Sequence, residues 1–330
     1  MVTTNPSEDR VMRSVLVTGG AGFIGSHLCE RLLQEGIRTV CLDNFDDFYE
    51  PAIKRKNVAP LLTSSLFETS EGDIRDLSLL RDFCDGHQFD RIVHLAARAG
   101  VRPSIQNPLL YEDVNIRGTL NTLEVCREFG IRNFVFASSS SVYGENTKIP
   151  FSEDDPADFP VSPYGATKRA GELLCYTYHH LYGIDVTCLR FFTAFGPRQR
   201  PEMAIHKFTR LIDQGKAIPM YGDGGSMRDY TYIDDIIDGL FRALLNNKGY
   251  EIYNLGESKT TRLIHLIEMI QRSLGKKAVI QELPDQPGDV PVTCANINKA
   301  REKLGYNPRF DIEDGIRRFV RWYRNPERDP

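Results

Sequence analysis

A glycine-rich segment between residues 15 and 33 constrains the fold of this chain more than any other feature. An apolar run, residues 15–17, precedes Gly19, Gly22 and Gly25, and apolar residues then recur at the spacing of one helix face. The pattern G-x-x-G-x-x-G differs by one residue from the dinucleotide-binding pattern G-x-G-x-x-G. Strand, tight turn and helix N-terminus in this order form an anion site. The segment therefore predicts a strand, a helix over residues 22–34 and a pyrophosphate-binding turn between them.

Asp43 follows a second apolar run, residues 39–42, and stands 18 residues after Gly25. An acid at this distance can accept hydrogen bonds from both ribose hydroxyls of the adenosine half of a dinucleotide. Its charge also repels a 2′-phosphate, so the pattern favours NAD over NADP. An aspartate at a strand end can equally cap a turn, and the sequence leaves this alternative open.

Tyr164 and Lys168 stand four residues apart in the segment SPYGATK. On a helix the phenol and the ammonium share one face, so the cation can lower the phenol pKa from its usual value near 10. An isolated Tyr-x-x-x-Lys is most often a surface pair on an amphipathic helix. Beside a dinucleotide turn, the pair instead predicts an acid/base group in hydride transfer.

Strand-like and helix-like segments alternate along the first 190 residues. Apolar runs predict buried parallel strands at 15–17, 39–42, 66–71, 92–96, 134–137 and 186–191. Helical patterns fall at 22–34, 109–129 and 164–182, and later at 263–274, 298–304 and 312–323. We therefore expect an α/β fold with a doubly wound parallel sheet, and a smaller C-terminal α/β region. We expect residues 1–189 to bind the dinucleotide, with 235–258 crossing back onto them, and 190–234 and 259–330 to bind the substrate.

Charge and hydropathy argue against several partners. The net charge of −4 and the pI near 6.0 give no basic footprint for nucleic acid. No apolar run reaches the length that spans a bilayer, and residues 1–12 lack the apolar core of a signal peptide. We expect a cytoplasmic protein with neither a membrane nor a nucleic-acid partner.

The cysteines and histidines predict neither disulfides nor a metal site. Seven cysteines occur singly, mostly within apolar runs, so we expect reduced core residues. His179 and His180 are adjacent and point about 100° apart on a helix, which does not suit one metal ion. His94 lies in an apolar run and is expected to be a packed residue.

These segments together resemble the extended short-chain dehydrogenase/reductases of the nucleotide-sugar epimerase group, over nearly the whole chain. The matching motifs are TGGAGFIG (18–25), DNF (43–45), GDIRD (72–76), HLAARAGVRPS (94–104), N-x-x-GT (115–119), SSSSVYG (138–144), SPYGATK (162–168), RFFTAFGPRQRPEMA (190–204), YGDGGSMRDYTYIDD (221–235) and PGDVPVTCANI (287–297). The resemblance implies an enzyme that binds NAD and a UDP-sugar.

The resemblance also assigns roles to individual residues. Tyr164 is then the acid/base, Lys168 holds the nicotinamide ribose, and Ser139 binds the sugar 4-hydroxyl. Cofactor contacts are implied for Gly19, Gly22, Phe23, Ile24, Gly25, Asp43, Asn44, Asp73, Ile74, Leu95, Ala96, Ala97, Tyr164 and Lys168. Substrate contacts are implied for Ser139, Ser140, Ser141, Thr193, Arg200, Arg228 and Asp289, with Arg228 at the diphosphate. Related dehydratases carry Asp-Glu where Ser140 and Ser141 stand here, so the resemblance disfavours dehydration.

The segments 191–204 and 283–323 resemble UDP-glucuronate 4-epimerases. In that subgroup, the residues matched by Thr193 and Arg200 approach the sugar carboxylate, whereas many UDP-glucose 4-epimerases carry Asn at the first position. Arg200 can also be read as a surface residue of a basic loop, since Arg198 is two residues away. We expect 4-epimerisation of UDP-glucuronate, with UDP-glucose as the alternative.

Two other classes of function remain to be compared with this expectation. A non-catalytic NAD-sensing interaction protein could use the same fold, but it would not need Tyr164, Lys168 and Ser139. A nucleotide-sugar reductase would usually use NADPH, which Asp43 disfavours. The resemblance further implies a homodimer through the segments 109–129 and 164–182.

Overall fold

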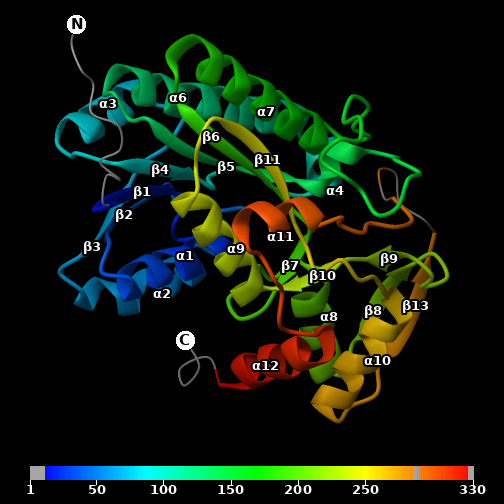
Figure 1. Ribbon diagram of the computed structural model, residues 1–330. Helices are drawn as coiled ribbons and strands as arrows, with labels where there is room; N and C mark the ends of the chain where they lie inside the picture. The colour runs from blue at the N-terminus through cyan, green and yellow to red at the C-terminus, as the bar shows by residue number, and fades with distance from the viewer. Residues whose placement is uncertain (1–11, 285–287, 289, 326–330) are drawn as a thin grey trace, which may run out of the picture.

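A seven-stranded sheet forms the centre of the protein (Figure 1). The computed structural model describes residues 12–284, 288 and 290–325. The strand order is β11-β6-β5-β4-β1-β2-β3, and every neighbouring pair is parallel. The strands are β1 (Ser14–Thr18), β2 (Arg38–Asp43), β3 (Phe67–Glu71), β4 (Arg91–His94), β5 (Asn133–Ser139), β6 (Asp185–Phe191) and β11 (Tyr250–Leu255). The predicted doubly wound parallel sheet is confirmed.

The strands divide their side chains between two apolar cores, because successive side chains point to opposite faces. Val15, Val17 and Val93 belong to one buried cluster, while Leu16 and Ile92 belong to the other. Both faces are therefore covered, which explains why the strands read as continuous apolar runs rather than as alternating ones.

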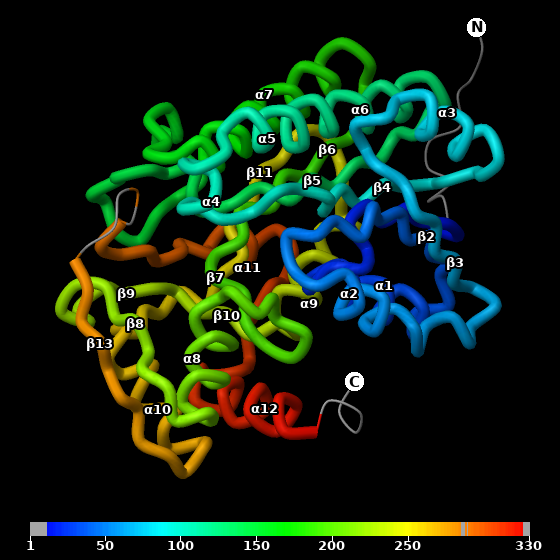
Figure 2. The backbone as a smooth tube through the Cα atoms, turned by 180° about the vertical axis from the view of Figure 1, so that it is seen from behind, coloured from blue at the N-terminus to red at the C-terminus, as the bar shows by residue number. Residues whose placement is uncertain are grey.

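Helices cover the two faces of the sheet in separate layers. In Figures 1 and 2, one layer holds α3 (Leu77–Asp85), α6 (Gly118–Glu128) and α7 (Pro163–Tyr182). The opposite layer holds α1 (Phe23–Gln34), α2 (Pro51–Val58), α9 (Ile233–Leu245) and α11 (Asn298–Leu304). Helix α7 begins where the sequence predicts, because Ser162 accepts a hydrogen bond from the Gly165 amide at 3.1 Å and Pro163 occupies the first turn.

Two predicted elements are shorter or more broken than the sequence suggests. The helix expected over 109–129 consists of α5 (Pro108–Glu112), a π-helical turn η2 (Asp113–Arg117) and α6. The Asn115 side chain lies in this turn and bonds the backbone of Arg98 and the Thr167 hydroxyl, which anchors the turn to its neighbours. Strand β4 ends at His94 rather than at Ala96, because Leu95 and Ala96 turn away to line a cavity.

The smaller region contains three two-stranded sheets, which pair β7 with β10, β9 with β12, and β8 with β13. Their strands are β7 (Thr193–Phe195), β8 (Ala217–Tyr221), β9 (Met227–Arg228), β10 (Tyr230–Tyr232), β12 (Thr261–Arg262) and β13 (Val279–Leu283). Its helices are α8 (Ala204–Asp213), α10 (Leu263–Leu274) and α12 (Ile312–Arg324). Helix α8 and strand β13 were not among the predicted elements. The remaining short helices are η1 (Ala59–Thr63), α4 (Val101–Gln106) and η3 (Ser140–Tyr143).

The chain returns to the large sheet after residue 232. Strand β11 pairs in parallel with β6 over its whole length, and Arg31 of α1 stacks on Phe241 of α9 at 4.7 Å from the ring centre. In the described residues, no helix is long and apolar enough to cross a membrane. Those residues also hold no group of three or more His, Cys, Asp or Glu side chains that could bind a metal ion.

Candidate active site

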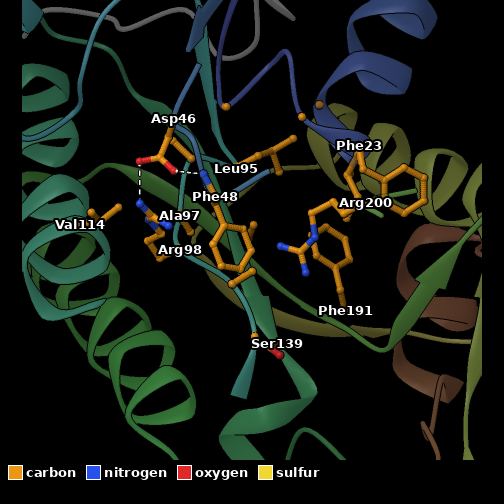
Figure 3. A pocket seen from close by; sticks show the side chains of 18 of the residues that line it. Phe23, Asp46, Phe48, Leu95, Ala97, Arg98, Val114, Ser139, Phe191 and Arg200 are labelled. Carbon is orange, nitrogen blue, oxygen red and sulfur yellow. Dashed lines mark hydrogen bonds and ion pairs between the residues drawn. The ribbon is translucent and has the colours of Figure 1, made fainter. Parts of the chain in front are cut away.

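A cavity of about 440 Å³ opens at the carboxyl ends of the central parallel strands, where ligands bind in doubly wound folds (Figure 3). It brings together nearly all the residues that the sequence predicted. The predicted residues that line it are Gly19, Gly22, Phe23, Ile24, Gly25, Asp43, Asn44, Asp73, Ile74, Leu95, Ala96, Ala97, Ser139, Ser140, Ser141, Tyr164, Lys168, Thr193 and Arg200.

The glycine turn between β1 and α1 fits against the neighbouring strand without room for side chains. Gly19 has φ +70°, and a Cβ atom there would lie 2.7 Å from the Ala96 amide nitrogen. A Cβ on Gly25 would lie 2.2 Å from the Gly19 carbonyl oxygen, so this glycine lets the helix pack on the turn. Gly22 caps α1 without a side-chain hydrogen bond. The first-turn amides of α1 therefore face the cavity as an anion site.

Asp43 is the last residue of β2, and its buried carboxylate already accepts hydrogen bonds from the backbone. Its oxygens accept hydrogen bonds from the Ala21 amide at 3.1 Å and the Phe45 amide at 2.9 Å. Burial raises the Asp43 pKa, although Lys54 opposes this with its Nζ 4.0 Å from Oδ1. The turn-capping alternative is thus realised, and each oxygen still keeps a lone pair for a ligand hydroxyl.

Asp73 and Ile74 form another part of the cavity wall. The Asp73 carboxylate accepts from Asn44 at 3.0 Å and from Arg75 at 2.8 Å. Burial alone would raise its pKa, but the bonds from Arg75 and Asn44 lower the pKa to about 2. Ile74 packs so closely on α6 that a Cβ at Gly118 would lie 2.4 Å from its Cδ1. This contact explains the glycine of the N-x-x-GT segment.

His94 is a packed residue beneath the cavity, as the sequence predicted. Its Nδ1 lies 2.8 Å from the Thr18 hydroxyl and its Nε2 lies 3.1 Å from the Thr119 hydroxyl. The Thr119 hydroxyl donates to the Asn115 carbonyl at 2.6 Å, so Nε2 carries the proton that Thr119 accepts. Burial lowers the His94 pKa to about 3, and the ring is neutral.

Tyr164 and Lys168 both lie on the buried side of α7. The Lys168 ammonium donates to the Ala137 carbonyl of β5 at 2.7 Å, and burial lowers its pKa to about 8. Burial raises the Tyr164 pKa, while the Ser139 hydroxyl and the Arg200 charge lower it less. Desolvation therefore dominates the Tyr164 pKa in the free protein, and the tuning of the phenol by Lys168 stays a prediction.

The serine run has a structural role as well as a place in the cavity. The Ser139 hydroxyl accepts from the Ser141 amide at 3.1 Å and lies 3.2 Å from the Ser141 hydroxyl. It therefore caps the short helix η3, which begins at Ser140. Ser139, Ser140 and Ser141 also line the cavity, and their contact with the substrate stays a prediction.

Thr193 and Arg200 both line the cavity, and Arg200 lies near an aromatic residue. The Arg200 guanidinium is 5.7 Å from the centre of the Phe48 ring, and its Nε is 3.0 Å from Glu202. Figure 3 shows Phe48 between Arg200 and Arg98, whose guanidinium is 5.1 Å from the same ring. The guanidinium groups of Arg98 and Arg200 thus both approach the Phe48 ring. These cation–π contacts help to hold the two side chains in place.

Two predicted substrate residues are not brought into this group. Arg228 lies on β9 outside the cavity lining, where it donates to the Met227 carbonyl at 2.9 Å and the Pro291 carbonyl at 3.3 Å. Asp289 lies outside the described residues. Their assignment to the substrate stays a prediction.

Sequence reasoning missed further residues of the cavity wall, among them Phe48, Tyr49, Lys54, Arg98 and Met203. Arg98 stands within the HLAARAGVRPS segment, so its position was a usable signal. Its guanidinium pairs with Asp46 at 2.8 Å. Phe48, Tyr49 and Lys54 lie in a loop and short helix after β2 that carry no distinctive pattern. Among the described residues, the Tyr49 hydroxyl is buried without a hydrogen-bond partner.

This combination of a parallel doubly wound sheet, a glycine turn and a Ser-Tyr-Lys group at the strand ends defines an extended short-chain dehydrogenase/reductase. The profile of the family described as GDP-mannose 4,6 dehydratase matches residues 16–319, and the chain belongs to this family. The predicted resemblance to the nucleotide-sugar epimerase group is confirmed.

The chain is similar to a named relative and to two solved structures over nearly its whole length. It is 45% identical to a UDP-glucuronate 4-epimerase of Thermodesulfobacterium geofontis, covering 93% of this chain and 95% of the relative. The structure of UDP-glucuronic acid 4-epimerase from Bacillus cereus with UDP-glucuronic acid and NAD has a TM-score of 0.88 and 38% identity, covering 95% and 99% of the two chains. A UDP-glucose 4-epimerase of Thermus thermophilus with NAD has a TM-score of 0.87 and 32% identity, covering 94% and 99%.

Proposed function

We propose that this chain catalyses the NAD-dependent 4-epimerisation of a UDP-sugar, converting UDP-glucuronate to UDP-galacturonate. The observation that carries this proposal is the single cavity that joins a glycine turn, Ser139, Tyr164 and Lys168 to Arg200. Relatives that share 45% and 38% of their residues with the chain over nearly its whole length are named for this activity.

NAD is the cofactor that the residues of the cavity fit. The uncapped first turn of α1 offers amides to a pyrophosphate, and Asp43 offers carboxylate oxygens to a ribose. Lys168 reaches the cavity from α7 and would hold the second ribose. NAD held by these residues would supply the acceptor, and later the donor, of the hydride at carbon 4 of the sugar.

The residues of the chain manage the proton and the orientation of the sugar. Tyr164 accepts the proton of the 4-hydroxyl as hydride leaves, and returns it when the 4-keto group is reduced. Burial raises its pKa in the free protein, and the positive charge of an oxidised nicotinamide beside it would favour the phenolate. Ser139 lies beside the phenol and orients the reacting oxygen.

The uronate carboxylate is assigned to Arg200 and Thr193. Arg200 already forms an ion pair with Glu202 and packs near Phe48, so its guanidinium is held at the cavity wall. A 4-keto-uronate is a β-keto acid and loses carbon dioxide when its carboxyl bond aligns with the carbonyl π system. A fixed carboxylate opposes that alignment, so Arg200 would both select the uronate and protect it.

Incubation of the purified protein with UDP-glucuronate and UDP-glucose in parallel tests the proposal. We expect the 4-epimer of UDP-glucuronate to form without added reductant, and to form faster than the 4-epimer of UDP-glucose, as read by NMR. Faster turnover of UDP-glucose would move the assignment to the glucose enzyme. NAD binding without turnover of either sugar would favour an NAD-sensing protein.

We propose a homodimer that associates through α6 and α7. Several apolar side chains on these two helices are exposed: Leu120, Leu173, Tyr176, Leu181 and Tyr182. A two-fold axis would bury them against their copies. Light scattering at micromolar concentration should give twice the chain mass, and Leu173→Glu should give the monomer mass.

We also keep two predictions as proposals. The division into a nucleotide-binding part (1–189, with 235–258) and a UDP-sugar-binding part (190–234 and 259–330) agrees with the pairing of β11 to β6. The second proposal is a cytoplasmic location. It agrees with the seven cysteines, all of which are buried free thiols, as expected in a reducing compartment.

A further inference from the structure

Three consecutive residues at the end of β5 meet three residues of α7 that lie one turn apart. The Ser139 hydroxyl lies close enough to Tyr164 to lower its pKa. The Ala137 carbonyl accepts a hydrogen bond from Lys168 at 2.7 Å, and the Ser138 hydroxyl donates one to Glu172 at 2.6 Å. Residues 164, 168 and 172 form one stripe of the helix, because side chains four residues apart share a face. Glu172 thus continues the line of reacting residues into the core.

Glu172 is fully buried and accepts four hydrogen bonds. Arg190 of β6 donates from Nε at 2.8 Å and from Nη2 at 2.9 Å, and Arg169 donates from Nη1 at 3.0 Å. Ser138 gives the fourth bond. Ser138 and Arg190 are neighbours in the register of β5 with β6, so the carboxylate joins both strands to α7. A charge-assisted, bidentate group of this kind is stiff.

The alternation of a strand gives Ser138 and Ser139 separate tasks. Both residues line the cavity, but successive side chains point to opposite sides, so the Ser138 hydroxyl bonds Glu172 while the Ser139 hydroxyl lies toward Tyr164. A shift of Ser138 relative to Glu172 would move Ser139 relative to Tyr164. The spacing between these two reacting groups is therefore set by the bond from Ser138 to Glu172, a residue outside the cavity lining.

Charge is the second contribution of Glu172. Burial lowers the Lys168 pKa, and the Glu172 carboxylate is one of the groups that raise it. Other titratable groups lie on the elements packed around this stripe, namely Tyr164, Cys175 and Arg190. Cys175, like Glu172, raises the Lys168 pKa. Without the carboxylate, a buried ammonium and a buried guanidinium would share one apolar region.

We propose that Glu172 is a positioning residue of this site, which holds the Ser138–Ser139 end of β5 against α7 and balances the charge of Lys168. This inference rests on the proposed function, since it takes Lys168, Tyr164 and Ser139 as the reacting group. The competing interpretation is a purely structural ion pair. A pair of that kind can often be replaced without loss of function, provided that the fold survives.

Two single variants separate the two contributions. Glu172→Gln removes the charge, and in 13C-lysine-labelled holoenzyme the Lys168 Cε signal should titrate roughly one pH unit lower than in wild type. The alkaline limb of the pH–rate profile should move with it. The signal is assigned by its loss in Lys168→Met. Ser138→Ala removes one bond and leaves the Arg190 pair intact, and kcat should fall ~10-fold with KM little changed.

Matched controls keep the test decisive. Ser138→Thr retains the hydroxyl and should restore turnover. Asp235→Asn perturbs another buried carboxylate, which accepts from the amides of Arg309 and Phe310, and should lower thermal stability without moving the Lys168 titration. If Glu172→Gln does not fold, the comparison of Ser138→Ala with Ser138→Thr decides the positioning role.

The inference would be overturned by an unshifted Lys168 titration in Glu172→Gln. It would also be overturned if Ser138→Ala and Ser138→Thr lost activity equally, or if activity in all variants followed melting temperature alone. A wild-type protein that turns over neither sugar would remove the proposed function, but the Lys168 titration would still decide whether Glu172 balances its charge.

Discussion

Glu172 and Asp229 are buried carboxylates that organise the two parts of the molecule in different ways. Glu172 is bound by two guanidiniums and a hydroxyl, and these donors outweigh burial, so its pKa is lowered. Asp229 accepts from the amides of Glu257, Ser258 and Ala295 and from the Thr231 hydroxyl, all of them neutral groups. Burial dominates there and raises its pKa to about 6.

The comparison indicates where each part is rigid and what its substitutions should change. In the part of the molecule that contains α7 and Tyr164, paired charges join this helix to the strand ends beside the cavity. In the smaller region, Asp229 joins three chain segments through neutral donors, and its own carbonyl accepts from the Thr193 amide at 3.0 Å. Substitutions in the first part should change the chemistry, and those around Asp229 should change stability with pH.

The largest effect is expected for Tyr164→Phe, which removes the proton acceptor and little volume. Turnover should fall by at least ~10²-fold while NAD stays bound. The assay is initial rate on UDP-glucuronate, with bound NAD read by absorbance after denaturation. Tyr182→Phe, at the end of the same helix, is the matched control and should keep full activity. Near-normal turnover in Tyr164→Phe would refute the catalytic assignment.

Arg200→Ala should come second, because it tests the junction between the two parts. A charge-assisted hydrogen bond in a partly desolvated site contributes about 1.5–3 kcal/mol, or roughly ten- to a hundred-fold. We expect that loss on UDP-glucuronate and a much smaller one on UDP-glucose. Mass spectrometry should also detect more decarboxylated 4-keto-pentose.

The control for Arg200 is Arg210→Ala, an exposed arginine of α8. It should leave both substrates unaffected. Equal losses on both sugars in Arg200→Ala would show instead that this arginine holds the loop or the diphosphate. The preference for the uronate would then rest on the relatives alone.

Local patterns predicted the first part of the molecule better than the second. Gly19, Gly25 and Asp43 were found from spacing because a strand–turn–helix unit fixes their positions within one short segment. Tyr164 and Lys168 were found from a helical spacing of four residues. Each of these signals is contained in fewer than thirty residues of sequence.

The residues that sequence reasoning missed depend on contacts between distant segments. Phe48 and Arg98 come together only because the loop after β2 folds over the end of β4. Glu172 is unremarkable in a helix until Arg190, 18 residues later, pairs with it. The rise of the Tyr164 pKa in the free protein was also not foreseen, because spacing along a helix does not report burial.

Asp43→Asn should produce an intermediate effect on cofactor choice. Removing the carboxylate charge leaves the Lys54 ammonium, now 4.0 Å from Oδ1, free of its opposing charge beside the ribose subsite. We expect the NADP-to-NAD affinity ratio to rise ~10-fold, which corresponds to about 1.4 kcal/mol. Calorimetry on cofactor-free protein measures both dissociation constants.

Lys54→Met in the Asp43→Asn background should cancel most of that gain, which separates attraction by Lys54 from loss of repulsion by Asp43. Stronger binding of NADP than of NAD by the unmodified protein would contradict the role given to Asp43. A loss of affinity for both cofactors alike would show that Asp43 acts only through its bonds to Ala21 and Phe45.

The smallest effect is expected from Asp229, and its sign follows from the direction of the pKa shift. The folded protein has a pKa of about 6 at this group, above the usual 3.8, so it binds the proton more tightly than the unfolded chain. Stability from this group is therefore fully present below the unfolded pKa and is lost as pH rises through the folded pKa. Glu172 has the opposite sign, because its lowered pKa gives stability that is lost as pH falls.

As the pH falls from 7 to 5, protonation of Asp229 should stabilise the folded protein by about 1 kcal/mol relative to the unfolded chain. That gain should raise the melting temperature by roughly 2 °C in a chain of this size. The asparagine in Asp229→Asn does not titrate, so its own contribution to the free energy of unfolding should be the same at both pH values. The melting temperature of wild type relative to Asp229→Asn should therefore move in favour of wild type by that amount as the pH is lowered. A constant difference would mean that the four neutral donors hold Asp229 ionised throughout, and the contrast with Glu172 would then lie in geometry rather than in charge.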